Sequence, residues 1–234
     1  MDNVDIVYHL AAKTGEEADI EKINTIATQK LFEACIKYHI KKVVFFSTVA
    51  VYKPNNVVTI TSIKEPSNLY GKTKLKAENI GLKYYKENKL PLIILEPCSV
   101  YGKTYNGSMG KIRKRTEKGF CIRIGTGDYK NTIIYIDDLI SIAINVIKNE
   151  NYIGKTLICG TETISIKEIN NVLKSKKNIQ EIYIPYKIAM LIMKLPFKLK
   201  VKSTIKQLTR QSEYITNYKM EKYIKYKEYV NNGE

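Results

Sequence analysis

Short apolar runs alternate along the chain with longer segments in which apolar residues recur every three or four positions. The runs predict buried strands at residues 5–10, 42–47, 91–97 and 156–159. The periodic segments predict amphipathic helices at residues 17–38, 70–88 and 165–173. Strands that alternate with helices in this way are typical of an α/β fold with a doubly wound parallel sheet, whose active crevice lies at the carboxyl ends of the strands.

The second half of the chain has shorter elements. Strands are expected at residues 121–124 and 133–136, on either side of a glycine-rich turn. Asp137 is expected to cap a helix at residues 139–147, and this helix is so apolar that we expect it to be buried. Ser165 and Glu168 have the spacing of a capping box. We divide the chain into a larger α/β domain at residues 1–174, with insertions from about residue 103, and a C-terminal segment at residues 175–234.

Residues 182–202 are apolar and basic at the same time. We interpret them as a helix of the lobe that covers the substrate. A helix lying on a membrane surface is the alternative, because lysines flank isoleucine, methionine and phenylalanine there.

The composition restricts the class of protein. A chain of 234 residues with 44% hydrophobic content is long enough for one sizeable α/β domain and a small lobe. Four widely spaced cysteines and two histidines argue against a zinc site and for a reducing compartment. The start is acidic and no apolar run reaches the roughly 18 residues that span a bilayer, so a cytoplasmic protein is expected.

The formal charge of +16 raises the question of nucleic-acid binding. The lysines are scattered through every segment and arginine is scarce, so nucleic acid is not the favoured partner. Attraction of anionic nucleotides or phosphates agrees better with this distribution.

Two residues one helical turn apart indicate acid/base chemistry. Tyr70 and Lys74 share a helix face, so the lysine ammonium can favour the ionised phenol. Such help is needed because the pKa of a free tyrosine is about 10, too high for a base at neutral pH. Ser47 and Thr48 stand at the end of the apolar strand at 42–47. Together these residues suggest oxidation and reduction of a hydroxyl or ketone.

Several further motifs surround this pair in a fixed order. They are HLAA at residues 9–12, Asn24 in a helix, FSTVAVY at 46–52, EPSNLYGKTKLKAE at 65–78, PCSVYG at 97–102 and YIDDL at 135–139. A tyrosine and lysine four residues apart are a weak signal alone, whereas the ordered set is specific. Over residues 4–174, and more weakly to 226, the chain resembles the extended short-chain dehydrogenase/reductase superfamily, in particular the NAD-dependent sugar-nucleotide epimerase/dehydratase family.

The resemblance implies a Rossmann-like fold, a nucleotide-sugar substrate and NAD or NADP as cofactor, with NAD favoured. It makes residues 1–174 a truncated NAD(P)-binding catalytic domain, with substrate-lobe insertions from about residue 103, and residues 175–234 a C-terminal segment of a small substrate lobe. Tyr70 would move a proton on and off a sugar hydroxyl, Lys74 would favour the phenolate and hold the nicotinamide ribose, and Thr48 would hydrogen-bond the same substrate oxygen. The other expected cofactor contacts are at strand ends and the loops after them: Leu10, Ala11, Ala12, Ser47, Pro97 and Val100.

The sequence departs from the family in three places. The family begins with a strand, a GxxGxxG turn and a helix that holds the pyrophosphate, and no such turn occurs here. Two βαβ units, on the order of 60 residues, are therefore expected to be missing, so that the strand at residues 5–10 becomes a sheet edge with an exposed apolar face. Glu96 stands where the family usually has arginine, and Lys53 replaces the usual glycine.

Three functions stay open. The chain is part of an epimerase, dehydratase or reductase of nucleotide sugars and is inactive or weakly active alone. Its expected partner is either a second copy, in a homodimer, or a chain that supplies the missing N-terminal half. Alternatively it is a non-catalytic remnant that acts as a binding partner. The third reading is a steroid-dehydrogenase-like reductase at a membrane surface, suggested by residues 182–202.

Other polar residues receive a structural interpretation. We expect His9 to be structural and Asn24 to kink its helix or bond to backbone. Adjacent carboxylates such as Asp137 and Asp138 point apart on a helix, so they are not an acid/base pair. The basic run at 111–115 is expected to be a solvated helix face rather than a diphosphate site.

Overall fold

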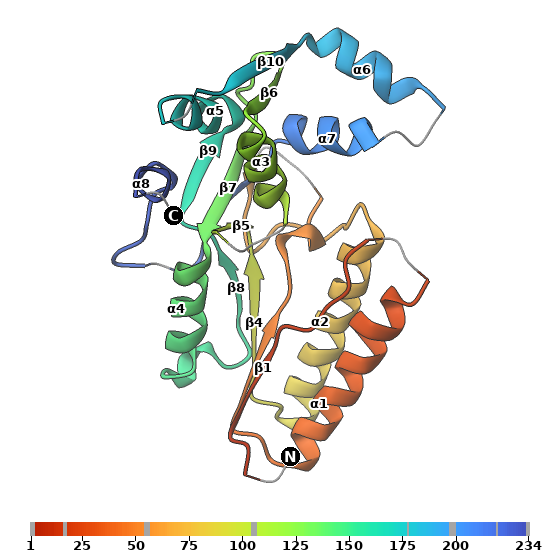
Figure 1. The fold of residues 1–234 in the computed structure, drawn as a ribbon. Coiled ribbons are helices and arrows are strands. Elements are labelled where there is room, and N and C mark those ends of the chain that lie inside the picture. Colours follow the sequence, from red (N-terminus) through yellow and green to blue (C-terminus); the bar gives the residue numbers. More distant parts are fainter. Residues whose placement is uncertain are drawn as a thin grey trace.

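A four-stranded parallel sheet forms the lower half of the molecule (Figure 1). The structure is a computed structural model that describes residues 3–15, 18–53, 57–103, 107–176, 178–196, 200–218 and 220–232. The strands run in the order β1 (Ile6–His9), β2 (Lys42–Phe46), β4 (Leu92–Pro97) and β8 (Thr156–Cys159). These are the four strands that the apolar runs predict, and the parallel sheet is confirmed.

Helices cover both faces of this sheet, as in a doubly wound fold. A π-helical turn (Lys22–Ile26), α1 (Ala27–Lys37) and α2 (Leu69–Asn88) lie on one face. On the other face lies α4 (Ile136–Val146). The middle strands β2 and β4 are mostly apolar because both of their faces are covered, and Val44, Ile93 and Leu95 are fully buried.

The upper half is a smaller lobe built from short elements. In one sheet β5 (Ser99–Tyr101) runs parallel to β7 (Lys130–Tyr135), and β9 (Glu162–Ser165) runs antiparallel to β7. β6 (Phe120–Ile124) pairs with β10 (Gln180–Ile184). The lobe's helices are α3 (Ser108–Glu117), α5 (Ile166–Lys174), α6 (Tyr186–Lys194), α7 (Lys200–Thr209) and α8 (Tyr226–Asn231).

Short elements complete the fold. They are the 3-10 turns η2 (Val49–Val51) and η3 (Glu150–Tyr152), and the strand pair β3 (Val57–Val58) and β11 (Glu213–Tyr214).

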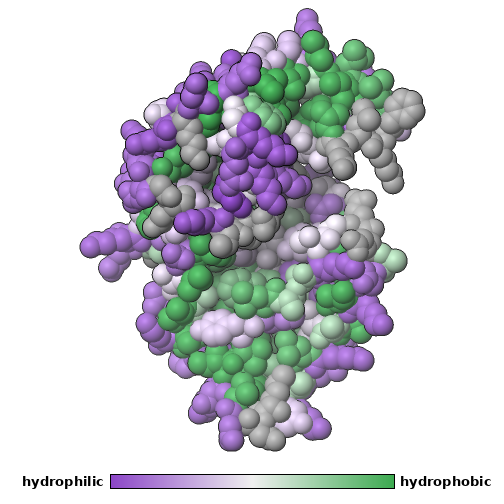
Figure 2. All heavy atoms as spheres, viewed as in Figure 1, coloured by the Kyte–Doolittle hydropathy of each residue, from purple (hydrophilic) through white to green (hydrophobic). Residues whose placement is uncertain are grey.

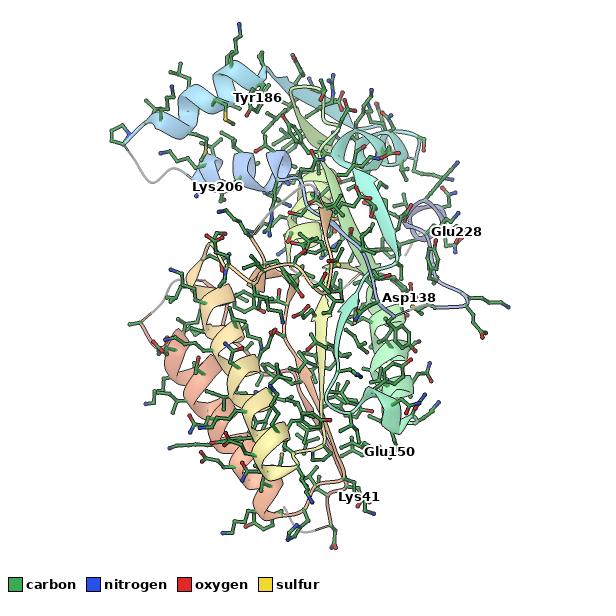
Figure 3. The ribbon with its side chains drawn as sticks, turned by 180° about the vertical axis from the view of Figure 1, so that it is seen from behind. Lys41, Asp138, Glu150, Tyr186, Lys206 and Glu228 are labelled. Carbon is green, nitrogen blue, oxygen red and sulfur yellow. The ribbon has the colours of Figure 1, made fainter. Side chains whose placement is uncertain are left out.

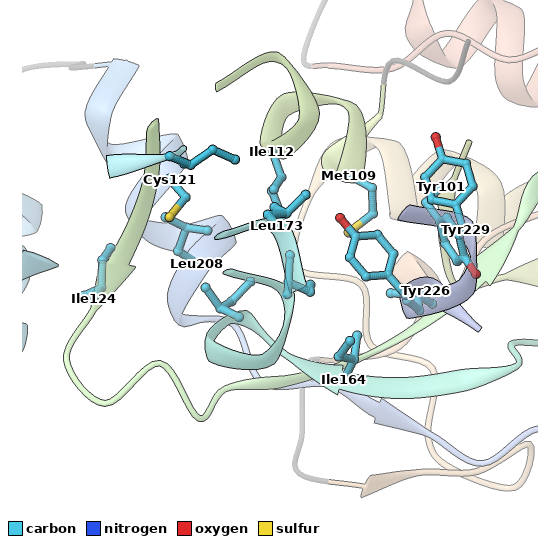
Figure 4. Packing of buried hydrophobic residues seen from close by; sticks show 14 of the residues in the cluster. Tyr101, Met109, Ile112, Cys121, Ile124, Ile164, Leu173, Leu208, Tyr226 and Tyr229 are labelled. Carbon is cyan, nitrogen blue, oxygen red and sulfur yellow. The ribbon is translucent and has the colours of Figure 1, made fainter. Parts of the chain in front are cut away.

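The lobe has its own hydrophobic core, shown in Figure 4. Tyr101 at the end of β5 packs against Tyr226 and Tyr229 of α8, with ring centroids 5.3 Å apart in both pairs. Met109 of α3 and Leu173 of α5 belong to the same cluster. The division into domains at residue 174 stays a prediction.

Two expectations about the second half are wrong in part. The helix after β7 begins at Ile136, so Asp137 and Asp138 lie in its first turn and Asp137 is not the cap. Asp138 is buried and accepts a hydrogen bond from the Ile224 amide at 3.2 Å (Figure 3), and burial raises the pKa of its carboxyl. The apolar stretch from residue 182 begins as strand β10 and becomes helical only at Tyr186. Strand β9 is not among the strands predicted from sequence; it contains only two apolar or β-branched residues and runs directly into the Ser165 cap of α5.

The helix α4 is also less buried than its composition predicts. Leu139 and Ile142 face the core, whereas Ile140 and Ile144 are each 48% exposed. Strand β1 forms an edge of the described sheet, and its side chains Ile6 and Tyr8 are exposed. Figure 2 shows apolar side chains gathered on this part of the surface. An exposed apolar face beside β1 is what the sequence predicts.

None of the helices in the described ranges combines the length and the apolar character needed to cross a membrane.

Candidate active site

A cavity of about 460 Å³ opens where the carboxyl ends of β1, β2 and β4 meet the first turns of α2 and α4. The residues expected from sequence that line it are Leu10, Ala12, Ser47, Thr48, Tyr70, Pro97 and Val100. These residues are spread over 91 positions of the chain, and the parallel sheet brings them together because its strands all end at one edge. Ala11 and Lys74 do not line the cavity.

Local capping interactions position Thr48 and Tyr70. The Thr48 hydroxyl accepts a hydrogen bond from the Ala50 amide at 3.2 Å, which caps η2. Asn68 caps α2 by accepting from the Gly71 amide at 2.7 Å, and Tyr70 is therefore in the first turn of that helix. A Cβ at Gly71 would lie 2.3 Å from the Ala50 carbonyl oxygen. Glycine is thus required for the close approach that puts Tyr70 and Thr48 on one cavity.

Lys74 lies one turn after Tyr70 and is almost completely buried, with 1% exposure. Its Nζ is 4.0 Å from the centre of the Phe45 ring and has no hydrogen-bond partner among the described residues. Burial lowers the pKa of Lys74 to about 8, although the neighbouring Glu78 carboxylate acts to raise it. A buried ammonium without a partner is costly, so it marks a position where a ligand hydroxyl would gain a strong hydrogen bond.

A buried polar network lies beside the cavity. The Lys64 Nζ donates to Glu78 Oε2 and to Glu96 Oε1, each at 2.5 Å, and both carboxylates are fully buried. The Ser47 hydroxyl donates to Glu78, and the Tyr52 hydroxyl donates to Glu96 at 2.9 Å. Glu96, which stands where the family usually has arginine, is thus paired with a lysine from the loop before α2. The network ties Ser47 and the strand that ends at Pro97 to that loop.

Two carboxylates that share one lysine in a buried place do not both ionise easily. Burial and the nearby Glu78 raise the pKa of Glu96 to about 7, while Lys64 and Tyr52 act to lower it. Burial acts to lower the pKa of Lys64, but the two carboxylates outweigh it and the pKa is raised. Lys64 is therefore charged at neutral pH, and Glu96 exchanges its proton there.

We expect the free energy of unfolding to fall by about 2 kcal/mol between pH 5 and pH 8 through Glu96. The pKa of Glu96 is higher in the folded protein than its ordinary value of 4.5, so the folded state holds this proton more tightly. The stabilisation is complete below about pH 4.5 and is lost as the pH rises through about 7. Urea unfolding of the natural chain and of Glu96→Gln over this range measures it.

In Glu96→Gln the free energy of unfolding should depend less on pH than in the natural chain. If it changes with pH by the same amount in both proteins, the raised pKa is not that of Glu96. His9 does not disturb this comparison because it is present in both proteins. Burial and the charge of Lys74 lower the pKa of His9 to about 4, so its own effect has the opposite sign and appears only on acidification below pH 6.5.

His9 and Asn24, which are interpreted as structural from the sequence, are held by hydrogen bonds within the fold. His9 Nε2 is hydrogen-bonded to Thr28 Oγ1 at 2.8 Å, and its ring stacks on Phe45. Asn24 lies in the π-helical turn, accepts from the Lys13 amide and donates to the Lys13 carbonyl, which confirms that it bonds to backbone. Lys53 forms an exposed ion pair with Glu65 at 3.3 Å.

The basic run on α3 is divided between solvent and the lobe. Lys111 and Lys114 are exposed, as a solvated helix face requires. Arg113 pairs with Glu117 at 2.7 Å, and Arg115 reaches Gln207 of α7 at 3.4 Å.

Sequence reasoning missed the apolar walls of the cavity. Tyr8, Phe46 and Cys98 come from the sheet, and α4 contributes Ile136, Leu139, Ile140, Ala143 and Ile144. The signal available for α4 was that its apolar residues cover about half of the helix surface or more, which is wider than one packed face needs.

The residues present suit a nicotinamide dinucleotide better than a metal ion. No group of three or more histidine, cysteine, aspartate or glutamate side chains within the described part of the chain could hold a metal. All four cysteines are buried and free. The unpartnered Lys74 ammonium beside a largely apolar cavity fits a ligand that offers ribose hydroxyls and a flat ring.

Comparison with known proteins agrees with this geometry. The model of the NAD dependent epimerase/dehydratase family matches residues 1–160. A dTDP-D-glucose 4,6-dehydratase of Dictyostelium discoideum is 32% identical over 200 residues, which are 76% of this chain and 45% of the relative. An uncharacterized UDP-glucose epimerase of Bacillus subtilis is 29% identical over 74% of this chain and 59% of the relative. The chain thus spans about half the length of the curated relatives it matches.

Solved structures show the same fold. UDP-glucuronic acid 4-epimerase from Bacillus cereus in complex with NAD superposes with a TM-score of 0.70 at 27% identity, over 89% of this chain and 71% of that one. A second structure of that enzyme contains UDP-glucuronic acid together with NAD, with a TM-score of 0.69 at 25% identity, over 88% of this chain and 74% of that one.

Proposed function

Since this chain belongs to the NAD-dependent epimerase/dehydratase family, we propose that it performs the acid/base half of a hydride-transfer reaction on a nucleotide sugar. One observation carries the proposal: Thr48 and Tyr70 line a single cavity, and the unpartnered Lys74 ammonium lies one helical turn from Tyr70. The relatives' names support the substrate class, because they describe epimerases and dehydratases of sugars attached to nucleotides. They do not favour a steroid-type substrate.

Each residue then has a definite task. Tyr70 takes a proton from a sugar hydroxyl or returns it to the ketone, and Thr48 holds that oxygen by a hydrogen bond. The charge of Lys74 makes the Tyr70 phenolate less costly, and its Nζ donates to the ribose next to the nicotinamide. Pro97, Val100 and Phe46 exclude water from the flat ring. When bound, NAD supplies the hydride acceptor, and NAD is proposed over NADP because the family is NAD-dependent.

Binding of the cofactor pyrophosphate needs the backbone amides of the family's GxxGxxG turn, and the 234-residue sequence contains no such turn. We propose that a βαβ unit with a GxxGxxG turn pairs with the exposed edge of β1, either in a longer form of this polypeptide or in a second chain. The unit would also cover the apolar side chains between β1 and α4, among them Tyr8, Ile140 and Ile144.

The test compares two proteins: the 234-residue chain and the same chain with a GxxGxxG βαβ unit fused ahead of β1. We expect weak NADH binding by the first, and by the second both saturable NADH fluorescence enhancement and turnover of a UDP- or dTDP-sugar. Tight NADH binding by the unfused chain would show that the extra unit is not needed. A fused protein that binds NADH but turns over no nucleotide sugar would overturn the proposed reaction.

A further inference from the structure

Helix α6 is apolar on two faces and only one of them is packed. Ala189 is fully buried against the lobe core, and Ile192 and Met193 pack beside it. The exposed side chains Ile188, Leu191 and Leu195 are 51%, 64% and 41% accessible. Ile188 and Leu191 are three residues apart and therefore lie on one face of the helix, and Leu195 follows its last residue, Lys194. We call these three residues the α6 stripe.

The surroundings of the stripe are strongly basic. From residue 182 to residue 212 the sequence contains seven lysine or arginine residues and no aspartate or glutamate. Lys187 and Lys194 are exposed, and the helical repeat places both along the same edge of the stripe. On the adjacent helix α7, Lys206 is also exposed (Figure 3).

Further apolar and aromatic side chains are exposed near the beginning of the helix. Tyr183 on β10 is 53% exposed, Tyr186 in the first turn of α6 is 47% exposed, and Ile182 is 43% exposed. In Figure 1, α6 projects from the end of the molecule farthest from the main sheet, and Figure 2 shows green, apolar side chains over the same place. Nothing in the described part of the chain packs over the stripe.

We propose that α6 docks on an anionic membrane surface, with the α6 stripe at the boundary of the acyl chains and the lysines on the headgroups. An amphipathic helix of this kind binds a bilayer through apolar side chains and basic charges together. Tyrosine is favoured at the same depth because its ring is apolar and its hydroxyl is polar.

Charge decides between a membrane and a second copy of this chain. A two-fold interface through α6 would bring two copies of the same acid-free segment together. Like charges would then face each other across the interface, which is unfavourable. A surface of anionic lipid headgroups has the opposite charge over an unlimited area. The inference is independent of the proposed reaction, because no α6 residue lines the cavity.

The experiment is sedimentation of the 234-residue chain with vesicles of phosphatidylcholine alone and of phosphatidylcholine with phosphatidylglycerol. We expect pelleting with the anionic vesicles that weakens as salt is added. The variant Ile188→Ser/Leu191→Ser should lower the partition coefficient about tenfold or more, because two large apolar side chains are lost. Lys187→Glu/Lys194→Glu should lower it on anionic vesicles while leaving the weak binding to neutral vesicles unchanged.

Two matched variants control for non-specific effects. Ile63→Ser removes an apolar side chain that is 86% exposed elsewhere, and Ile144→Ser removes one from the other apolar surface, beside β1. Both should pellet like the natural chain, and far-UV circular dichroism verifies that all variants are folded. Absence of pelleting, or equal pelleting of the stripe variant, would overturn the proposal. A lipid-independent dimer that the stripe variant abolishes would overturn it too, because the stripe would then be an interface between copies.

Discussion

Tyr70→Phe is expected to lower nucleotide-sugar turnover by about 10²–10⁴-fold, the usual contribution of a positioned acid/base group. The substitution removes only the hydroxyl, and the ring that lines the cavity remains. The affinity for NADH should change little, because the cofactor contacts proposed for Lys74, Pro97 and Val100 are intact. Steady-state turnover and NADH fluorescence, measured on the form of the protein that shows turnover, separate the two effects.

Tyr85→Phe is the matched control, since Tyr85 lies on the same helix and contacts Gly154, far from the cavity. It should leave turnover unchanged. If Tyr70→Phe also keeps full turnover, Tyr70 does not carry the proton. If it loses NADH affinity to the same extent as turnover, its role is binding rather than proton transfer.

Lys64→Met is expected to lower the free energy of unfolding by about 3–5 kcal/mol, the cost of breaking a buried ion pair. The variant leaves Glu78 and Glu96 fully buried with no cation between them. Repulsion between the two carboxylates then adds to the cost of their burial. Urea denaturation at pH 8, where Glu96 would otherwise be ionised, measures the loss.

The chain offers both a control and a rescue for this prediction. Lys53→Met breaks the exposed pair with Glu65 and should change stability little. Adding Glu96→Gln to Lys64→Met should restore a large part of the stability, because one buried charge is removed. If Lys64→Met costs no more than Lys53→Met, the network does not stabilise the fold as described.

The strands and the long helices could be predicted from sequence because their signals are local. Residues 42–47 and 91–97 are apolar runs of strand length, and the structure has β2 and β4 there. Asn68 and Ser165 are N-caps of α2 and α5, which are also local features. The start of α4 was misplaced because Tyr135, not Asp137, precedes the helix, and its side chain makes no capping bond.

The sequence predicted the polar side chains that line the cavity more completely than the apolar ones. Ser47, Thr48 and Tyr70 have recognisable spacing and neighbours, and all three line the cavity. Ile140 and Ile144 belong to a helix whose composition predicts burial, although they are half exposed there. Which apolar residues are left uncovered depends on what packs against the helix, and composition does not contain that information.

The sequence by itself determined the class of fold, the order of the strands along the chain and the pairing of Tyr70 with Lys74, because these depend on periodicity and on spacing within one helix. Only the tertiary structure decided that Lys64 neutralises Glu78 and Glu96, and that the Lys74 ammonium is buried without a partner. Lys64 and Glu96 are 32 positions apart, and their meeting requires a loop to fold over the end of a strand. The charge state of a buried group is set by what surrounds it in space, and for these residues the surroundings come from distant parts of the chain.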